Sequence, residues 1–168
     1  SWIQDPVNAN ATDYTIVPHL SIPNGTKTWV FDGGTRNLVV DSSTKTTTIT
    51  VRDMTATLTD SADPAFSATY TWSRDMAADW SVAGQYKLSG TFTFQNSASD
   101  RGPVNGSISA SAPLIWETGC CHPQSGTINL TRVLSGATAS ATFSQPCGTL
   151  TVAWGSGRSA TLTLSCPS

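Results

Sequence analysis

Residues 46–58 read TTTITVRDMTATL, and this stretch decides the class of fold. Ile49 and Val51 alternate with threonines, and the alternation resumes on the even positions from Met54 onward. A period of two between apolar and hydroxyl residues is typical of a β-strand that buries one face. Because the parity changes at residues 52–53, we expect a β-bulge or a sharp bend there.

The same alternation recurs along most of the chain. It returns at residues 67–73, 86–94 and 104–116, and then at 128–130, 139–143, 150–154 and 160–164. The last four stretches predict a meander with a hairpin loop at 155–158. Residues 75–80 are the single helix candidate, long enough for a turn or two. We therefore predict an all-β protein, an antiparallel β-sandwich of about ten strands, with a barrel or jelly roll as the second choice.

The length of 168 residues predicts one domain. Residues 1–23 contain three prolines and no clean period, which favours an extended N-terminal arm in front of a domain at 24–168. An apolar arm can add a strand to a neighbouring subunit or fold back onto its own domain. The residues that would carry either role are Trp2, Ile3, Val7, Tyr14, Ile16 and Val17.

The composition and net charge argue against two classes of partner, nucleic acids and membranes. Only 12% of the residues are charged and the net charge is −2, so no basic field attracts nucleic acid or an anionic membrane. No apolar stretch of 18 residues occurs, and we expect no membrane insertion. Polarity comes from 26 Thr and 22 Ser instead. We expect no regular Thr-x-Thr array across the strands.

Four cysteines lie in the last third of the chain, at Cys120, Cys121, Cys147 and Cys166. An even number in a Thr-rich β-type chain indicates a disulfide framework and an extracellular or cell-surface location. A bridge between the adjacent cysteines is strained, which favours 120–147 with 121–166 or 120–166 with 121–147. Both pairings staple the predicted meander. A zinc site is disfavoured because no C-x₂₋₄-C knuckle is present.

The sequence offers little for catalysis or for a cofactor. A nucleophile beside His122 is disfavoured because the preceding cysteines are expected to be oxidised. The nearest carboxylate pairs for glycoside hydrolysis are Asp60 with Asp63 and Asp75 with Asp79, and we keep a small secreted hydrolase that uses Asp75 and Asp79 as a remote alternative. No metal site is predicted, apart from a weak calcium candidate at Asp60 and Asp63 in a turn-like segment.

Two further features suit an extracellular protein. Trp80 follows a loop-like acidic segment and is the best candidate for an exposed contact with a glycan. Four N-x-S/T triplets mark candidate glycosylation sites at Asn10, Asn24, Asn105 and Asn129.

These observations predict a non-enzymatic structural or adhesive protein of the extracellular space or cell surface. We expect self-association or a surface partner, with assembly into fibres through the N-terminal arm as one route. A carbohydrate-binding module centred on Trp80 is the alternative from a different class.

Overall fold

The computed structural model describes residues 2–4, 11–16, 19–97 and 100–166, and for 2–4 and 11–16 only the backbone is considered. The described part of the chain is all β and holds no helix that is long and apolar enough to cross a membrane. Its strands are β1 (Trp2–Gln4), β2 (Ala11–Ile16), β3 (His19–Asn24), β4 (Lys27–Asp32), β5 (Thr35–Asp41), β6 (Thr46–Asp60), β7 (Asp63–Asp79), β8 (Gln85–Asn96), β9 (Val104–Ile108), β10 (Leu114–Glu117), β11 (Gly126–Arg132), β12 (Thr138–Ser144), β13 (Thr149–Trp154) and β14 (Ser159–Thr163).

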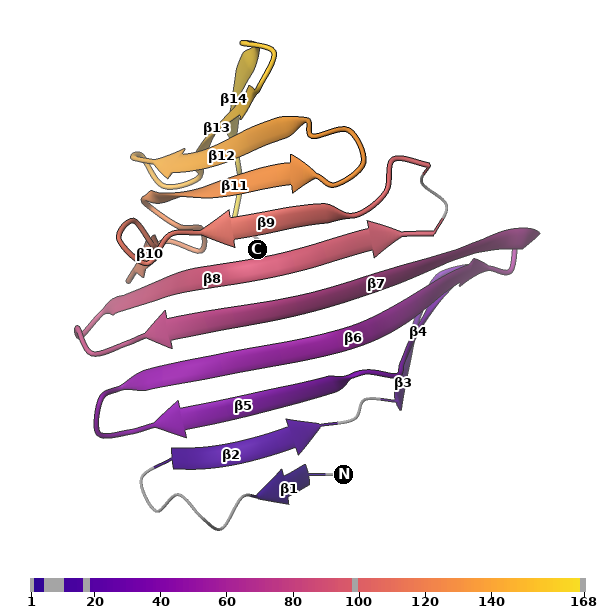
Figure 1. Cartoon of the computed structure of the whole chain (residues 1–168), viewed down its shortest axis with the longest axis horizontal. Coiled ribbons are helices and arrows are strands. Elements are labelled where there is room, and N and C mark those ends of the chain that lie inside the picture. The colour runs from indigo at the N-terminus through magenta and orange to yellow at the C-terminus, as the bar shows by residue number, and fades with distance from the viewer. Residues whose placement is uncertain (1, 5–10, 17–18, 98–99, 167–168) are drawn as a thin grey trace.

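All of these strands belong to one antiparallel sheet (Figure 1). The path runs β1-β2-β5-β6-β7-β8-β9-β11-β12-β13-β14, while β4 pairs with the second half of β6 and β10 with the first half of β8. The sheet is open at both ends of this path. The predicted sandwich is therefore not confirmed, because alternation shows which side of a strand is apolar but not which layer packs against it.

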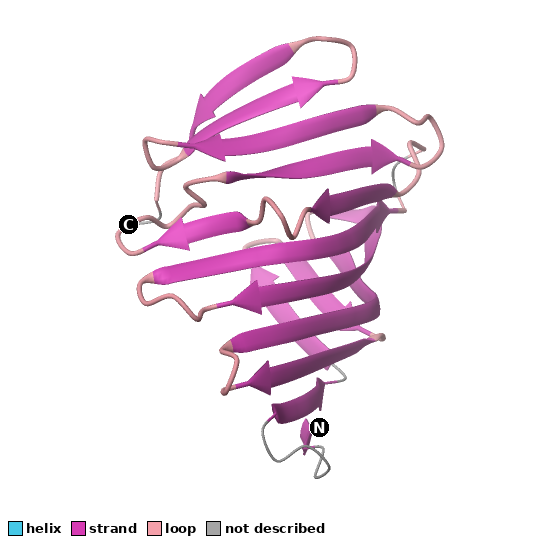
Figure 2. Cartoon of the chain, turned by 60° about the vertical axis from the view of Figure 1, so that its left-hand side comes forward, coloured by secondary structure: helices cyan, strands magenta, loops and turns pink. Residues whose placement is uncertain are grey.

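The predicted bulge in the deciding stretch is confirmed. The register of β6 with β7 shifts between Val51 and Met54, and Asp53 has a φ of 48°. On one side of the bulge β6 pairs with β5, and beyond it β6 pairs with β4. Figure 2 shows the result, since the β3–β4 hairpin turns behind the plane of the other strands. The bend gives the sheet a hollowed side.

The helix candidate at residues 75–80 is wrong, because residues 75–79 continue strand β7. Met76 pairs with Ile49 on one side and with Gly90 on the other, and Ala78 likewise lies between two strands. Backbone pairing on both sides overrides the weak local preference of two alanines for a helix.

The sheet has two chemically distinct faces. One cross-strand row on the first face, from β5 to β14, consists of Leu38, Ile49, Met76, Gly90, Ile108, Ile128, Ala141, Val152 and Ala160. The adjacent row on the other face consists of Asn37, Thr50, Asp75, Thr91, Ser107, Asn129, Ser140, Ala153 and Ser159. We call these sides the apolar face and the hydroxyl face.

The C-terminal meander β11–β14 is confirmed, and two disulfides staple it. Cys120 bonds to Cys147 in the β12–β13 turn, and Cys121 bonds to Cys166 after β14. This is one of the two pairings that the sequence left open. Loops of 27 and 45 residues are closed in this way, which by chain entropy contributes roughly 3.5 and 4 kcal/mol.

The predicted N-terminal arm forms strands in the described residues. β2 pairs with β5 of the same chain and β1 pairs with β2, while β3 forms a hairpin with β4. Two of its apolar candidates, Val7 and Val17, lie outside the described residues. Addition of this segment to a neighbouring subunit stays a prediction.

Gly90 has a backbone conformation that no other residue type fits. Its φ is +136°, and a Cβ there would lie 2.1 Å from the carbonyl oxygen of Asp75. We expect Gly90→Ala to lower the free energy of unfolding by about 3 kcal/mol, measured by urea denaturation. Gly136→Ala is the matched control, because Gly136 also has positive φ but open space around it. Its expected loss is about 1 kcal/mol, and equal losses would contradict the steric explanation.

The turn between β5 and β6 gives a second prediction. The carboxylate of Asp41 accepts hydrogen bonds from the Ser43 hydroxyl at 2.6 Å and from the Ser43 and Thr44 amides at 2.8 and 3.2 Å. The Ser43 hydroxyl is the largest cause that lowers the pKa of Asp41 from 3.8 to about 2. Since the pKa is lower in the folded chain, this stabilisation is present above about pH 4 and lost as the pH falls toward about 2.

An NMR titration of the Asp41 carboxyl carbon should give a midpoint of about 2 in the native protein. Ser43→Ala should move that midpoint upward, toward the ordinary value. An unchanged midpoint in Ser43→Ala would show that the hydroxyl does not hold the carboxylate.

Candidate functional site on the apolar face

Aromatic side chains from three strands meet on the apolar face. Trp29 and Phe31 come from β4, Tyr70 and Trp72 from β7, and Phe94 from β8. The ring centroids of Trp29 and Tyr70 are 5.2 Å apart, those of Phe31 and Trp72 6.1 Å, and those of Tyr70 and Phe94 5.8 Å. Alternate residues of a strand point to the same side of the sheet. The pairing of β4 with β6, of β6 with β7 and of β7 with β8 therefore brings these rings together on one face.

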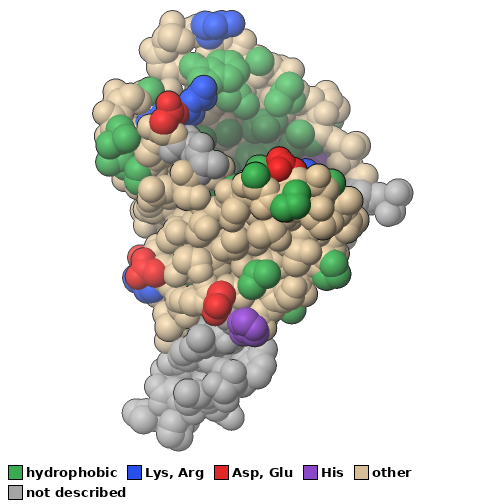
Figure 3. All heavy atoms as spheres, turned by 90° about the vertical axis from the view of Figure 1, so that its right-hand side faces the viewer, with side chains coloured by type: hydrophobic (Ala, Val, Ile, Leu, Met, Phe, Trp, Pro, Cys, Tyr) green, Lys and Arg blue, Asp and Glu red, His purple; other side chains and the backbone are tan. Residues whose placement is uncertain are grey.

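Beside these rings lies a cavity of about 420 Å³. It is lined by Ile49, Trp72, Ser73, Arg74, Met76, Tyr86, Leu88, Phe92, Thr93 and Phe94. Most of this lining is aromatic or aliphatic, and the volume is within the range of roughly 300–1,000 Å³ for small-molecule pockets. Figure 3 shows hydrophobic side chains gathered in a hollow of the surface.

Much of the apolar face is open to solvent. The exposed fractions of Tyr86, Phe94 and Trp154 are 37%, 41% and 45%. Val51 is the largest fully buried side chain in the described residues. The sheet thus presents an apolar surface that its own described strands do not cover.

Two arginines stand out on this face. Arg36 of β5 and Arg74 of β7 both pair with Val51 of β6, and Arg74 also lines the cavity. Burial lowers the pKa of Arg74, and the charge of Arg36 adds to that effect. Burial also raises the pKa of Tyr86 in the same lining. Sequence analysis missed both arginines, although Arg74 stands at the same parity as Trp72 and Met76.

Threonines face one another locally on the hydroxyl face, since Thr55 pairs with Thr71 and Thr57 with Thr69 on β6 and β7. The hydroxyls of Thr57 and Thr69 are 3.4 Å apart. The neighbouring strands do not continue these pairs, because Gln95 of β8 lies opposite Thr71 and Val30 of β4 lies opposite Thr57.

The candidate hydrolase pair is not brought together. Asp75 and Asp79 lie four residues apart on β7, which separates their Cα atoms by about 13 Å along an extended strand. Each is paired with a cation instead, Asp75 with Arg52 at 2.7 Å and Asp79 with Lys87 at 3.7 Å. Glycosidase carboxylates are roughly 5–9.5 Å apart, so this arrangement does not support that chemistry.

The pKa of Asp79 also argues against a role in glycoside hydrolysis. Hydrogen bonds from Ser81, first from its hydroxyl and then from its amide, lower the pKa of Asp79. A general acid needs a raised pKa, so this carboxylate is unsuited to that role.

The calcium candidates lie at the hairpin turn between β6 and β7, where Asp60 pairs with Asp63. The Asp60 carboxylate accepts a hydrogen bond from the Ala62 amide at 3.0 Å, which lowers the pKa of Asp60. Asp63 accepts one from the Ala65 amide at 3.2 Å. Both are turn-capping contacts of the ordinary kind. Calcium binding here stays a prediction.

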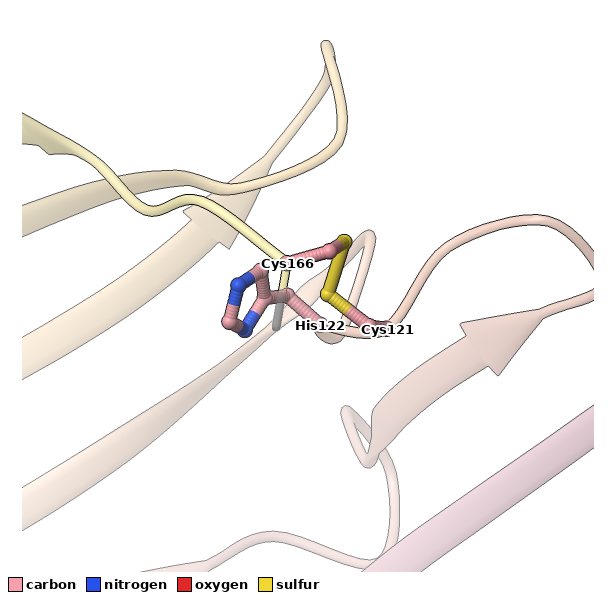
Figure 4. Close-up of side chains that lie close together, drawn as sticks. All are labelled: Cys121, His122 and Cys166. Carbon is pink, nitrogen blue, oxygen red and sulfur yellow. A yellow bond between two sulfur atoms is a disulfide. The ribbon is translucent and has the colours of Figure 1, made fainter. Parts of the chain in front are cut away.

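Cys121, His122 and Cys166 form the cluster in Figure 4, with potential ligand atoms within 4.8 Å of one another. The two sulfurs are joined in a disulfide, so they are not the thiolates that bind metals. The His122 Nε2 lies 3.1 Å from the Ser165 carbonyl oxygen. This contact gives the imidazole a structural role beside the bridge.

Trp80, the candidate glycan contact, is 37% exposed and follows β7 directly. Its indole Nε1 donates to the Thr47 hydroxyl at 3.4 Å. None of the ring pairs found among the described aromatic residues includes it. A lone, partly covered ring offers a small platform for a sugar.

The candidate glycosylation sites have different surroundings. Asn105 and Asn129 are exposed on the hydroxyl face, and Asn105 accepts a hydrogen bond from Thr93 at 3.0 Å. Asn24 ends β3, and Asn10 lies outside the described residues. Glycosylation at these positions stays a prediction.

Comparison with known proteins gives no match for this chain among family models, curated proteins or solved structures. The function therefore has to be argued from the two faces of the sheet themselves.

Proposed function

We propose that the protein is a non-enzymatic extracellular binding protein that holds the apolar chain of a small amphiphile on its apolar face. The observation that carries this proposal is the cavity of about 420 Å³ with its aromatic and aliphatic lining. Pockets of this size and chemistry commonly bury most of a small ligand.

Exposure on the apolar face supports the same role. Tyr86, Phe94 and Trp154 remain 37%, 41% and 45% exposed there. Exposed apolar patches of more than a few hundred Å² are uncommon on soluble monomers and mark binding surfaces. An amphiphile whose chain lay in the cavity would remove part of this surface from water.

The chemistry of the lining favours binding over turnover. The lining includes no carboxylate, imidazole or thiol, which are the usual groups of acid–base and nucleophilic catalysis. The extracellular assignment is supported by two disulfides, which persist in oxidising compartments.

The neutral dye N-phenyl-1-naphthylamine tests the proposal, because its fluorescence rises in apolar surroundings. We expect saturable one-to-one binding to the native protein. Phe94→Glu should weaken it by about 10- to 100-fold, because a charge replaces an apolar contact in the cavity. Gln95→Glu is the matched control, since the next residue of β8 takes the same charge on the hydroxyl face.

Equal dye binding by the two variants would overturn the proposal. So would a native dimer, measured by light scattering, that excludes the dye. That result would assign the apolar face to a second copy and would produce the two-layered sandwich that the sequence suggested.

Self-assembly through the N-terminal segment is a second candidate, favoured by one observation. β14 is the last strand at one end of the open sheet. No described strand pairs with its outer edge, and all five of its residues are exposed. An unpaired edge strand is a template for strand addition, the mode that a structural or adhesive fibre subunit would use.

Deletion of residues 1–17 tests this second candidate. We expect electron microscopy of the native protein to show filaments and the truncated protein to show none, because the added strand is lost. Circular dichroism and urea denaturation should still report a folded β protein. Filaments formed equally well by the truncated protein would rule out strand addition by this segment.

A further inference from the structure

Two cationic side chains lie side by side on an otherwise apolar face. Arg36 and Arg74 flank Val51 in the register, so all three side chains point to the same side of the sheet. Neighbouring strands are roughly 4.8 Å apart, which places the two arginine Cα atoms about 10 Å from each other. Long side chains starting from these positions can reach one small anion between them.

Neither arginine has an anionic partner within the described part of the chain. Its three ion pairs use other cations, namely Arg52, Lys87 and His19. The Nε atoms of Arg36 and Arg74 are buried and have no hydrogen-bond partner. Because buried N–H groups are nearly always hydrogen-bonded in folded proteins, two such groups on one face indicate a missing acceptor.

The pair is also electrostatically unfavourable as it stands. Burial weakens the hydration of the Arg74 guanidinium, and Arg36 adds a like charge on the same row. No acidic residue lines the cavity to offset these charges. An anion held between the two groups would offset both effects.

An arginine on an apolar surface can instead lay its stem along the surface and extend its head into water. For Arg74 this would leave the buried Nε without a hydrogen-bond acceptor, in a residue that forms part of the cavity wall with Trp72 and Tyr86. An anion at the cavity wall would supply that acceptor. Arg52 gives the contrast, because it pairs with Asp75 in the ordinary exposed manner.

We propose that Arg74 and Arg36 bind the anionic headgroup, carboxylate or phosphate, of a single-chain amphiphile whose hydrocarbon chain lies in the cavity. This inference rests on the proposed function and adds the charge of the ligand. A second copy of the chain suits the site less well, because a copy facing it would present its own arginines.

Displacement of bound N-phenyl-1-naphthylamine by three ten-carbon ligands tests the proposal. Decanoate, decyl phosphate and decanol share the chain and differ in the headgroup. We expect both anions to displace the dye at concentrations about tenfold or more below that of decanol, because charge-assisted hydrogen bonds are added. The tighter anion identifies the headgroup. Inorganic phosphate alone should not displace the dye.

Arg36→Met should weaken the two anions about tenfold, while decanol and the dye stay within about twofold, because Arg36 is not part of the cavity lining. Arg74→Met should abolish the preference for the anions over decanol, compared within that variant. Arg52→Met is the matched control, since Arg52 is paired with Asp75, and it should leave the preference unchanged. Without ligand, Arg74→Met should also raise the urea midpoint, because an unpaired charge leaves the apolar face.

The outcomes separate the two proposals. Equal displacement by the anions and decanol, or an unchanged preference in Arg74→Met, overturns the anion site and leaves the binding function standing. Failure of the neutral dye to bind the native protein overturns the binding function itself.

Discussion

The pleat of a single sheet is the constraint on which the rest of this structure depends. Each strand sends alternate side chains to opposite sides, and the described strands form only one sheet. One side can carry threonine and serine toward water, but the other must carry the apolar half of the sequence without a second sheet packed on it. Burial is consequently shallow, and stability rests on cross-strand pairing, local bends and two covalent bridges.

The features of the fold that could be predicted from sequence are those that depend on residues close together in the chain. The change of parity at residues 52–53 marked the bulge, and the alternation at 128–164 marked the meander. The packing of one sheet against another could not be predicted, since the sequence of a strand does not show which residues pack against its apolar side. The helix expected at residues 75–80 failed for a related reason, because the partners that hold Met76 in a strand are Ile49 and Gly90, both distant in sequence.

Part of the candidate site could have been predicted from the sequence in the same way. Arg74 stands between Trp72 and Met76 at an apolar parity, and a charge at such a position is a local signal. The role of Arg36 becomes visible only once β5 is placed beside β6, because its partner Val51 lies 15 residues further along the chain. Within the described residues, the Nε atoms of Arg36 and Arg74 are buried on the apolar face without a hydrogen-bond partner, which lowers stability. Such costs are common at functional sites.

The adjacent cysteines have a consequence for the integrity of the molecule. Cys120 and Cys121 act as one covalent anchor for two later segments, the turn at Cys147 and the tail at Cys166. A protease that cuts the backbone once anywhere between residues 120 and 166 therefore releases no fragment, because at least one bridge still joins the two pieces. The part of the chain that carries the meander can be nicked and remain a single covalent molecule.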